Sequence, residues 1–379
     1  MITPPQCRLA LPRRLATASL LALALAAGGG CADQPAAKRA GAPNAALTNP
    51  TDPENPASPE QAVLSAPTPL FDILPPNAAP GAQPSRLFGS LPYGSSFAGL
   101  SAPVMAALRD AQTIVTEAPS GQTGAKGEEL EAAVMDRLIN IQDGETLRKD
   151  LDDETGELAE RVKAILTQSL ETAPLVDAGL VDRMHAFFVL SLLLPAKPKG
   201  MTTEGGGARV AQAEAARLGK PVVSLQTKAE AFERKASIPP QAAQALLRRL
   251  AQDWDSVARN AQKTAEAYES GDFAASRKLS DEMIADLIAT APEAAEYLKS
   301  QFGRERRRAW ADKIEALAQN ERILAIVDQS HLTGPDGLVA LLLADGWTVR
   351  PAGAEAPEGG PGNGRQAGKR PAQSEGSSP

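Results

Sequence analysis

His331 is a side chain whose type and position suggest chemistry. It lies in "AIVDQSHLTGPDGLVALLLADGW" (325–347), where a short β-branched run ends at a polar corner and an apolar, helix-like pattern follows. A histidine at such a corner can serve as a general base or a metal ligand. The only other histidine, His185, lies in an apolar helical pattern and is predicted to be a hydrogen-bonded core residue. With two histidines, HExxH motifs and multi-histidine zinc sites are excluded.

Three glycine-containing segments imitate other chemical motifs but miss the required spacing. The segment "EAPSGQTGAKGEE" (117–129) lacks the Gly-Lys-Ser/Thr order that surrounds a phosphate with amides and a lysine. "GSSFAG" (94–99) has Ala98 where a nucleophile elbow needs its second glycine. "GMTTEGGGAR" (200–209) follows no predicted strand. These segments are therefore predicted to be loops.

Composition and charge limit the classes of partner. The 379 residues are 43% hydrophobic but only 4% aromatic, so the core must consist mostly of aliphatic side chains. The net charge of -7 gives no electrostatic basis for binding nucleic acid, and no nucleic-acid partner is expected. The basic cluster "GRERRRAW" (303–310) is predicted to be a solvated or salt-bridged helix face.

The amino-terminal residues have the pattern of an export signal. Arg8, Arg13 and Arg14 precede an apolar stretch at 15–27 that is too short to span a bilayer, and small residues follow it. Cys31 then stands where bacterial lipoproteins are cleaved and acylated. Cys7 would be removed with residues 1–30, which leaves no cysteine to pair with Cys31. We therefore expect a lipid anchor at Cys31.

The lipid anchor predicts a place in the cell envelope. The protein is expected to face the periplasm, on the outer membrane because residue 32 is not aspartate. Cleavage by the ordinary signal peptidase near residues 24–26 is the alternative, and it would give a soluble periplasmic protein.

The elements that must position His331 lie between two low-complexity segments. Residues 31–83 are rich in Pro, Ala and Asn and are predicted to be a tether, and 353–379 form a Gly/Pro/Ser-rich disordered tail. Between them, 84–352 is predicted to be one helix-rich α/β domain around a small, mostly parallel or mixed sheet. Its predicted strands are 86–91, 113–118, 221–226, 323–328 and 347–351. Helical patterns cover most of the rest, including one from the Pro239-Pro240 pair to Gly271.

The order of several segments resembles the TraB/GumN family, which is related to the Tiki metalloproteases. The likeness covers about 84–352, and its most specific part is the family's closing pattern VGxxHLxGxxGLxxLLxxxGyxV. The corresponding stretches here are "LFGSLPYG", "ALRDAQTIVTEA", "QDGETLRKDL", "GKPVVSLQT", "YESGDF", "GRERRRAWADKI" and "IVDQSHLTGPDGLVALLLADGWTV". The resemblance implies an α/β fold with a polar site at the carboxyl edge of the sheet. It also implies metal-dependent proteolysis in the Tiki members.

The resemblance carries four residues over as candidate catalytic groups. These are Glu117, Glu305, Arg306 and His331, and of them His331, Glu117 and Glu305 are the candidate metal ligands. Other positions depart from the family pattern, namely Ser90, Pro92, Thr202, Gln226, Arg307 and Asp328. Pro92 stands in place of a histidine, and Gln226 in place of a glutamate. A catalytic metal needs about three protein ligands.

Two functions follow as hypotheses. In the first, the protein is a catalytically degenerate family member that binds a peptide, a polysaccharide or an envelope protein, with no cofactor. In the second, it is a metal-dependent, peptidase-like hydrolase in which His331, Glu117 and Glu305 hold a divalent metal.

Overall fold

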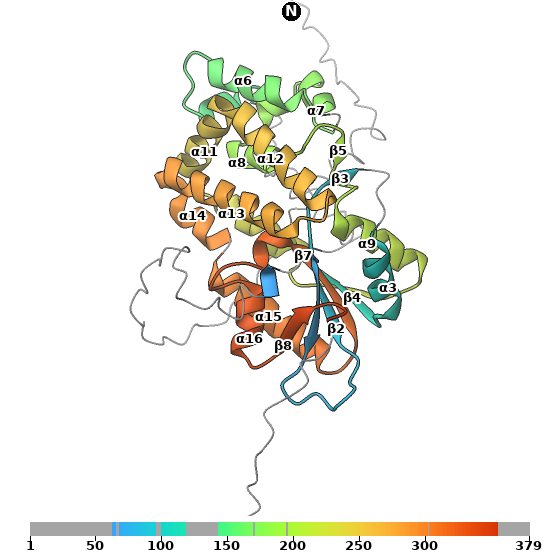
Figure 1. Cartoon of the computed structure of the whole chain (residues 1–379). Helices are drawn as coiled ribbons and strands as arrows, with labels where there is room; N and C mark the ends of the chain where they lie inside the picture. Colours follow the sequence, from blue (N-terminus) through green and yellow to red (C-terminus); the bar gives the residue numbers. More distant parts are fainter. Residues whose placement is uncertain are drawn as a thin grey trace, which may run out of the picture.

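A six-stranded mixed sheet forms the centre of the lower half of the molecule in Figure 1. The computed structural model describes residues 63–65, 68–95, 100–118, 143–169, 171–194, 196–301 and 303–354. The strand order is β6-β4-β7-β2-β1-β8. The strands are β1 (Leu70–Leu74), β2 (Ser85–Ser90), β4 (Thr113–Thr116), β6 (Val222–Ser224), β7 (Ile323–Asp328) and β8 (Thr348–Pro351). The predicted helix-rich α/β class is confirmed.

The direction of the strands decides where polar groups can gather. Strands β6, β4, β7 and β2 run parallel, so their carboxyl ends reach the same edge of the sheet. Strand β1 is antiparallel to both β2 and β8. In open α/β sheets, ligands bind outside the carboxyl ends of the parallel strands. A separate two-stranded ribbon, β3 (Gly94–Ser95) with β5 (Met201–Thr202), lies beyond that edge.

Helices cover both faces of the sheet (Figure 1). On one face, α3 (Ala102–Asp110) and α9 (Gly207–Arg217) pack on Leu324 and Ile326 of β7. On the other face, α15 (Arg304–Ala318) and α16 (Leu338–Ala344) pack on Ala325 and Val327. Successive side chains of a strand point to opposite faces, so an uninterrupted apolar run such as "ILAIV" fits a strand buried on both sides.

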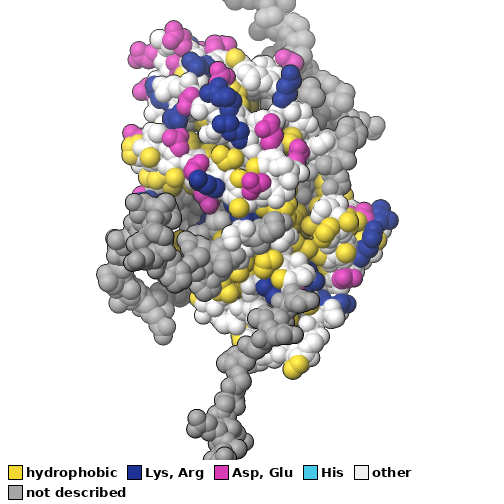
Figure 2. Space-filling view, in the orientation of Figure 1, with side chains coloured by type: hydrophobic (Ala, Val, Ile, Leu, Met, Phe, Trp, Pro, Cys, Tyr) yellow, Lys and Arg dark blue, Asp and Glu magenta, His cyan; other side chains and the backbone are white. Residues whose placement is uncertain are grey.

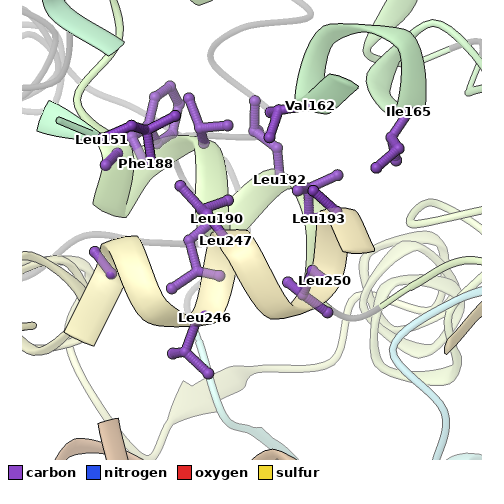
Figure 3. Packing of buried hydrophobic residues seen from close by; sticks show 14 of the residues in the cluster. Leu151, Val162, Ile165, Phe188, Leu190, Leu192, Leu193, Leu246, Leu247 and Leu250 are labelled. Carbon is purple, nitrogen blue, oxygen red and sulfur yellow. The ribbon is translucent and has the colours of Figure 1, made fainter. Parts of the chain in front are cut away.

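A second, helical layer sits above the carboxyl edge of the sheet (Figure 1). Its helices are α5 (Thr146–Asp150), α6 (Glu157–Leu166), α7 (Ala173–Asp177), α8 (Ala186–Leu193), α10 (Lys228–Ala236), α11 (Pro240–Gln252), α12 (Trp254–Glu269), α13 (Phe273–Thr290) and α14 (Ala295–Gln301). Figure 3 shows the core of this layer, where Leu190 of α8 meets Leu247 of α11 and Val162 of α6 lies next to Leu192. This core is separate from the two clusters that flank the sheet. The layer therefore closes the space above the strand ends.

The prediction that residues 31–83 form a tether is wrong for Leu70–Leu74. This segment is β1, and it lies inside the sheet between β2 and β8. Its Asp72 is only 4% exposed, and its charge is compensated by ion pairs with Arg86 on one neighbouring strand and Arg350 on the other. Asp72 interrupts the apolar run, and a proline-rich stretch lies next to it, so the sequence pattern did not indicate a strand.

Two smaller predictions also need correction. The helix expected to run from the Pro239-Pro240 pair to Gly271 is interrupted at Asp253, which separates α11 from α12. His185 is hydrogen-bonded as expected, with Nδ1 2.9 Å from Oδ2 of Asp150, but its side chain is 36% exposed and precedes α8. Among the described residues, no helix is both long enough and apolar enough to cross a membrane.

Candidate functional site

A pocket of about 300 Å³ opens at the carboxyl edge of the parallel strands. Each of these strands supplies a polar residue at or just after its end: Ser90 from β2, Glu117 from β4, Gln226 from β6 and Asp328 from β7. The parallel register brings these residues together although they lie far apart in the sequence. This is the edge at which the resemblance implies a polar site.

The Glu117 carboxylate lies near His331 at this edge. Its Oε1 lies 4.0 Å from His331 Nε2 and accepts a 2.5 Å hydrogen bond from the backbone N–H of Asp328. Burial raises the pKa of Glu117 from 4.5 to about 7, even though the Arg306 guanidinium acts to lower it. Near neutral pH this carboxyl is therefore divided between its charged and neutral forms.

His331 is held in a short helical turn directly after β7. Asp328 caps that turn by accepting a 2.8 Å hydrogen bond from the N–H of Ser330. Asp328 has φ −60°, a conformation open to any residue, so replacing the family's glycine does not strain the backbone here. His331 is 4% exposed, and its ring lies edge-on to Trp310, with ring centroids 4.8 Å apart.

The charges around His331 oppose its protonation. Burial lowers its pKa well below 6.5, and Arg306, Arg307 and Arg234 lower the pKa further. A neutral imidazole can bind a metal or accept a proton, but adding a positive charge beside these guanidinium groups is unfavourable.

Arg307 stabilises the His331 turn from helix α15. It is 7% exposed and donates hydrogen bonds to two backbone carbonyl oxygens, Ser330 O at 2.7 Å and Thr333 O at 3.3 Å. The resemblance expects asparagine at this position. The arginine here binds backbone rather than substrate, so its place in the structure is that of a support for the turn.

Consecutive residues of α15 point in different directions, because each helical residue is rotated by about 100° from the last. Arg306 lines the pocket, with its guanidinium carbon 4.3 Å from the centre of the Trp310 ring. It also donates a 3.3 Å hydrogen bond to Gln226 Oε1. Glu305 is exposed and does not line the pocket. The structure therefore joins Glu117, His331 and Arg306 and leaves Glu305 outside.

The donor set does not fit a catalytic divalent metal. Within the part of the chain that the structure describes, no three His, Cys, Asp or Glu side chains are grouped so that they could hold a metal ion. Glu117 and His331 are two donors where about three are needed, and Arg306 is a competing cation beside them. Pro92 lines the same pocket in the place of the expected histidine and offers no side-chain ligand.

Three successive glycines lie against the backbone on either side of Pro92. A Cβ on Gly205 would lie 2.1 Å from Gly94 O, and one on Gly206 would lie 2.6 Å from Pro92 O. The N–H of Gly207 donates a 3.1 Å hydrogen bond to Leu91 O. The segment "EGGGAR" is thus a close backbone contact that leads into α9, and the sequence interpretation as a plain loop missed this role.

Several pocket residues were not singled out from the sequence. They are Lys197, Arg209, Gln212, Arg234 and Lys235, which come from the segment after α8 and from helices α9 and α10. One local signal could have located α10: the capping box in which Thr227 and Glu230 exchange hydrogen bonds directly after β6. Which face of that helix meets the pocket is decided by packing.

Comparison with known proteins gives one match. A family model described as the TraB/PrgY/gumN family matches residues 78–351. No curated protein and no solved structure matches the sequence. The match begins before residue 84, the expected start of the folded domain.

Proposed function

The chain belongs to the TraB/PrgY/gumN family, and from this premise we propose that it is an exported lipoprotein that binds an envelope ligand or partner without hydrolysing it. The observation that carries the proposal is the donor set at the carboxyl edge of the sheet. Glu117 and His331 remain together, at 4.0 Å, but Pro92 and Gln226 occupy pocket positions where the family resemblance expects a histidine and a glutamate.

The electrostatic environment supports binding over catalysis by a metal. Arg306 and Arg234 both act to lower the pKa of His331, so they disfavour positive charge near this ring. A divalent cation carries more charge than a proton and would meet the same opposition. The pocket is present, while the groups that would bind a metal are few among the described residues.

The proposal is tested by metal content and hydrolysis. We expect the purified full-length chain to retain well under one equivalent of divalent metal, and an unfolded peptide to remain intact with added Mn²⁺, Co²⁺ or Zn²⁺. Elemental analysis measures the bound metal, and mass spectrometry detects cleavage of the peptide. About one equivalent of metal, with peptide cleavage that is lost in His331→Ala, would contradict the binding role.

A metal-dependent, peptidase-like hydrolase is the second candidate. The specific observation in its favour is the contact between Glu117 and His331, which are two of the three candidate metal ligands. Glu305 would have to move toward the pocket to complete three ligands. The same experiment separates the two functions, because only the hydrolase loses turnover when His331 is replaced.

The lipid anchor at Cys31 is part of the proposal and rests on the amino-terminal sequence, which lies outside the described residues. We expect the expressed chain to incorporate a labelled fatty acid and to sediment with membranes. Cys31→Ser is expected to lose the label and to appear in the soluble fraction. Equal labelling of the wild-type protein and the Cys31→Ser variant would rule out acylation at Cys31.

A further inference from the structure

The pocket at the carboxyl edge is lined by cations from several elements. Arg209 comes from α9, Arg234 and Lys235 come from α10, and Arg306 comes from α15. Lys197 also lines it. This concentration is local, because the chain carries a net charge of -7 and Figure 2 shows basic and acidic side chains interspersed over the visible helical layer.

The carboxylates of the pocket leave much of this positive charge unbalanced. Lys197 is paired with Glu171, which fixes it in the pocket wall. Asp328 and Glu117 are the acidic residues that line the pocket, and both already accept hydrogen bonds from backbone N–H groups. Within the described part of the chain, neither Arg209 nor Lys235 forms an ion pair with a carboxylate. Positive charge therefore exceeds negative charge among the lining side chains.

Burial removes part of the solvation of these lining cations. Burial and the neighbouring Arg306 lower the pKa of Lys235 from 10.5 to about 8. Burial lowers the pKa of Arg306 to about 10, although Glu117 acts in the opposite direction. The Nε of Arg234 is buried and has no hydrogen-bond partner among the described residues. A bound anion would relieve each of these conditions.

We propose that this pocket binds the oxyanion group, a carboxylate or a phosphate, of a small organic ligand, with Arg234, Lys235 and Arg306 as the main contacts. Guanidinium groups present paired N–H donors that match two oxygens of such a group. The rest of the pocket is lined partly by apolar side chains, including Leu192, Leu194 and Ala231, which suit the carbon part of a ligand. This inference rests on the proposed binding function and names the ligand chemistry for the same pocket.

Binding of two simple oxyanions to the full-length chain tests the inference. Isothermal titration with inorganic phosphate and with succinate, at an ionic strength held constant with sodium chloride, is expected to show one saturable site. We expect a Kd on the order of 1 mM or below for at least one of them. The two probes distinguish phosphate from carboxylate as the preferred group.

Matched variants on two helices connect that binding to the pocket. Arg306→Gln and Arg234→Gln are each expected to weaken binding roughly tenfold, because each removes a charged hydrogen-bond donor. Arg304→Gln is the control: it removes a 72% exposed arginine that lies two residues before Arg306 and does not line the pocket. Circular dichroism checks that each variant is folded. Lys235→Gln provides the same test if either arginine variant unfolds.

The possible outcomes separate this inference from the proposed function. No saturable binding of either probe, or equal weakening by Arg304→Gln and Arg306→Gln, overturns the oxyanion site and leaves the test of metal and hydrolysis unaffected. Saturable binding that the pocket variants weaken supports the site. If metal-dependent cleavage were found as well, the oxyanion site would stand and the non-hydrolytic role would fall.

Discussion

Deleting residues 1–80 is expected to abolish folding, because the deletion removes β1 from the interior of the sheet. Phe71 and Ile73 are 0% exposed and pack with Trp310 on one face, while Leu70 packs on the other. Each large apolar side chain contributes about 1.5–3 kcal/mol by burial. The deletion also removes the hydrogen bonds of β1 to β2 and β8. Typical domains are stable by only about 5–15 kcal/mol.

A chain that begins at residue 60 is the matched control. It keeps β1 together with Val63 and Leu64, which pack against the core beside α15 and α16. It is expected to show cooperative thermal unfolding by circular dichroism, whereas the shorter chain shows none. Within the longer chain, Phe71→Ala is expected to cost about 3–5 kcal/mol, measured by urea denaturation. Cooperative unfolding of the chain that lacks 1–80 would contradict the role assigned to β1.

Replacing Glu117 by glutamine is expected to change how stability depends on pH. The folded protein holds the pKa of Glu117 at about 7, raised from 4.5, mainly by burial. Folding is thus favoured while the carboxyl is protonated, and this contribution is lost as the pH rises from 4.5 through about 7. Because one pH unit of pKa difference is worth about 1.4 kcal/mol, ionisation of Glu117 costs the folded state roughly 3 kcal/mol.

The expected result is a difference between two pH curves. Relative to wild type, the unfolding free energy of Glu117→Gln rises by up to roughly 3 kcal/mol between about pH 5 and about pH 8. The variant also loses the attraction between the Glu117 carboxylate and Arg306, which reduces this gain. Urea denaturation across that range measures the change. His331 acts in the opposite sense, since its pKa is lowered, but it is present in both chains. Glu305→Gln, an exposed change on α15, controls for general loss of charge. Parallel curves for Glu117→Gln and wild type would contradict the raised pKa.

The strands that were predicted correctly are those whose signal is local. Runs such as "ILAIVD" and "TIVTEA" combine β-branched residues with turn signals, and they form β7 and β4. The strand "LFDIL" was missed because its central Asp72 becomes acceptable only when Arg86 and Arg350 arrive from the neighbouring strands. Those arginines are brought by pairing between strands distant in the sequence, and no local pattern reports this.

The same distinction holds for the site. A family pattern pointed to Glu117 and His331, and parallel strand ends brought them within 4.0 Å. The family pattern gave no indication of Arg234 and Lys235, which lie on α10 and line the pocket. Neighbouring residues of "GRERRRAW" also have different surroundings. Arg306 lines the pocket, Arg307 supports the His331 turn, and Glu305 is exposed.

By itself, the sequence determined the family, the α/β class and the parallel strands whose ends carry the polar residues, because these depend on residue types and their order along the chain. The tertiary structure decided that the pocket is lined by more cations than carboxylates and lacks a three-residue metal cluster among the described residues. Helix phase and long-range packing select which side chains meet at one place, and burial then sets their pKa values. Those properties arise only when distant segments are brought together.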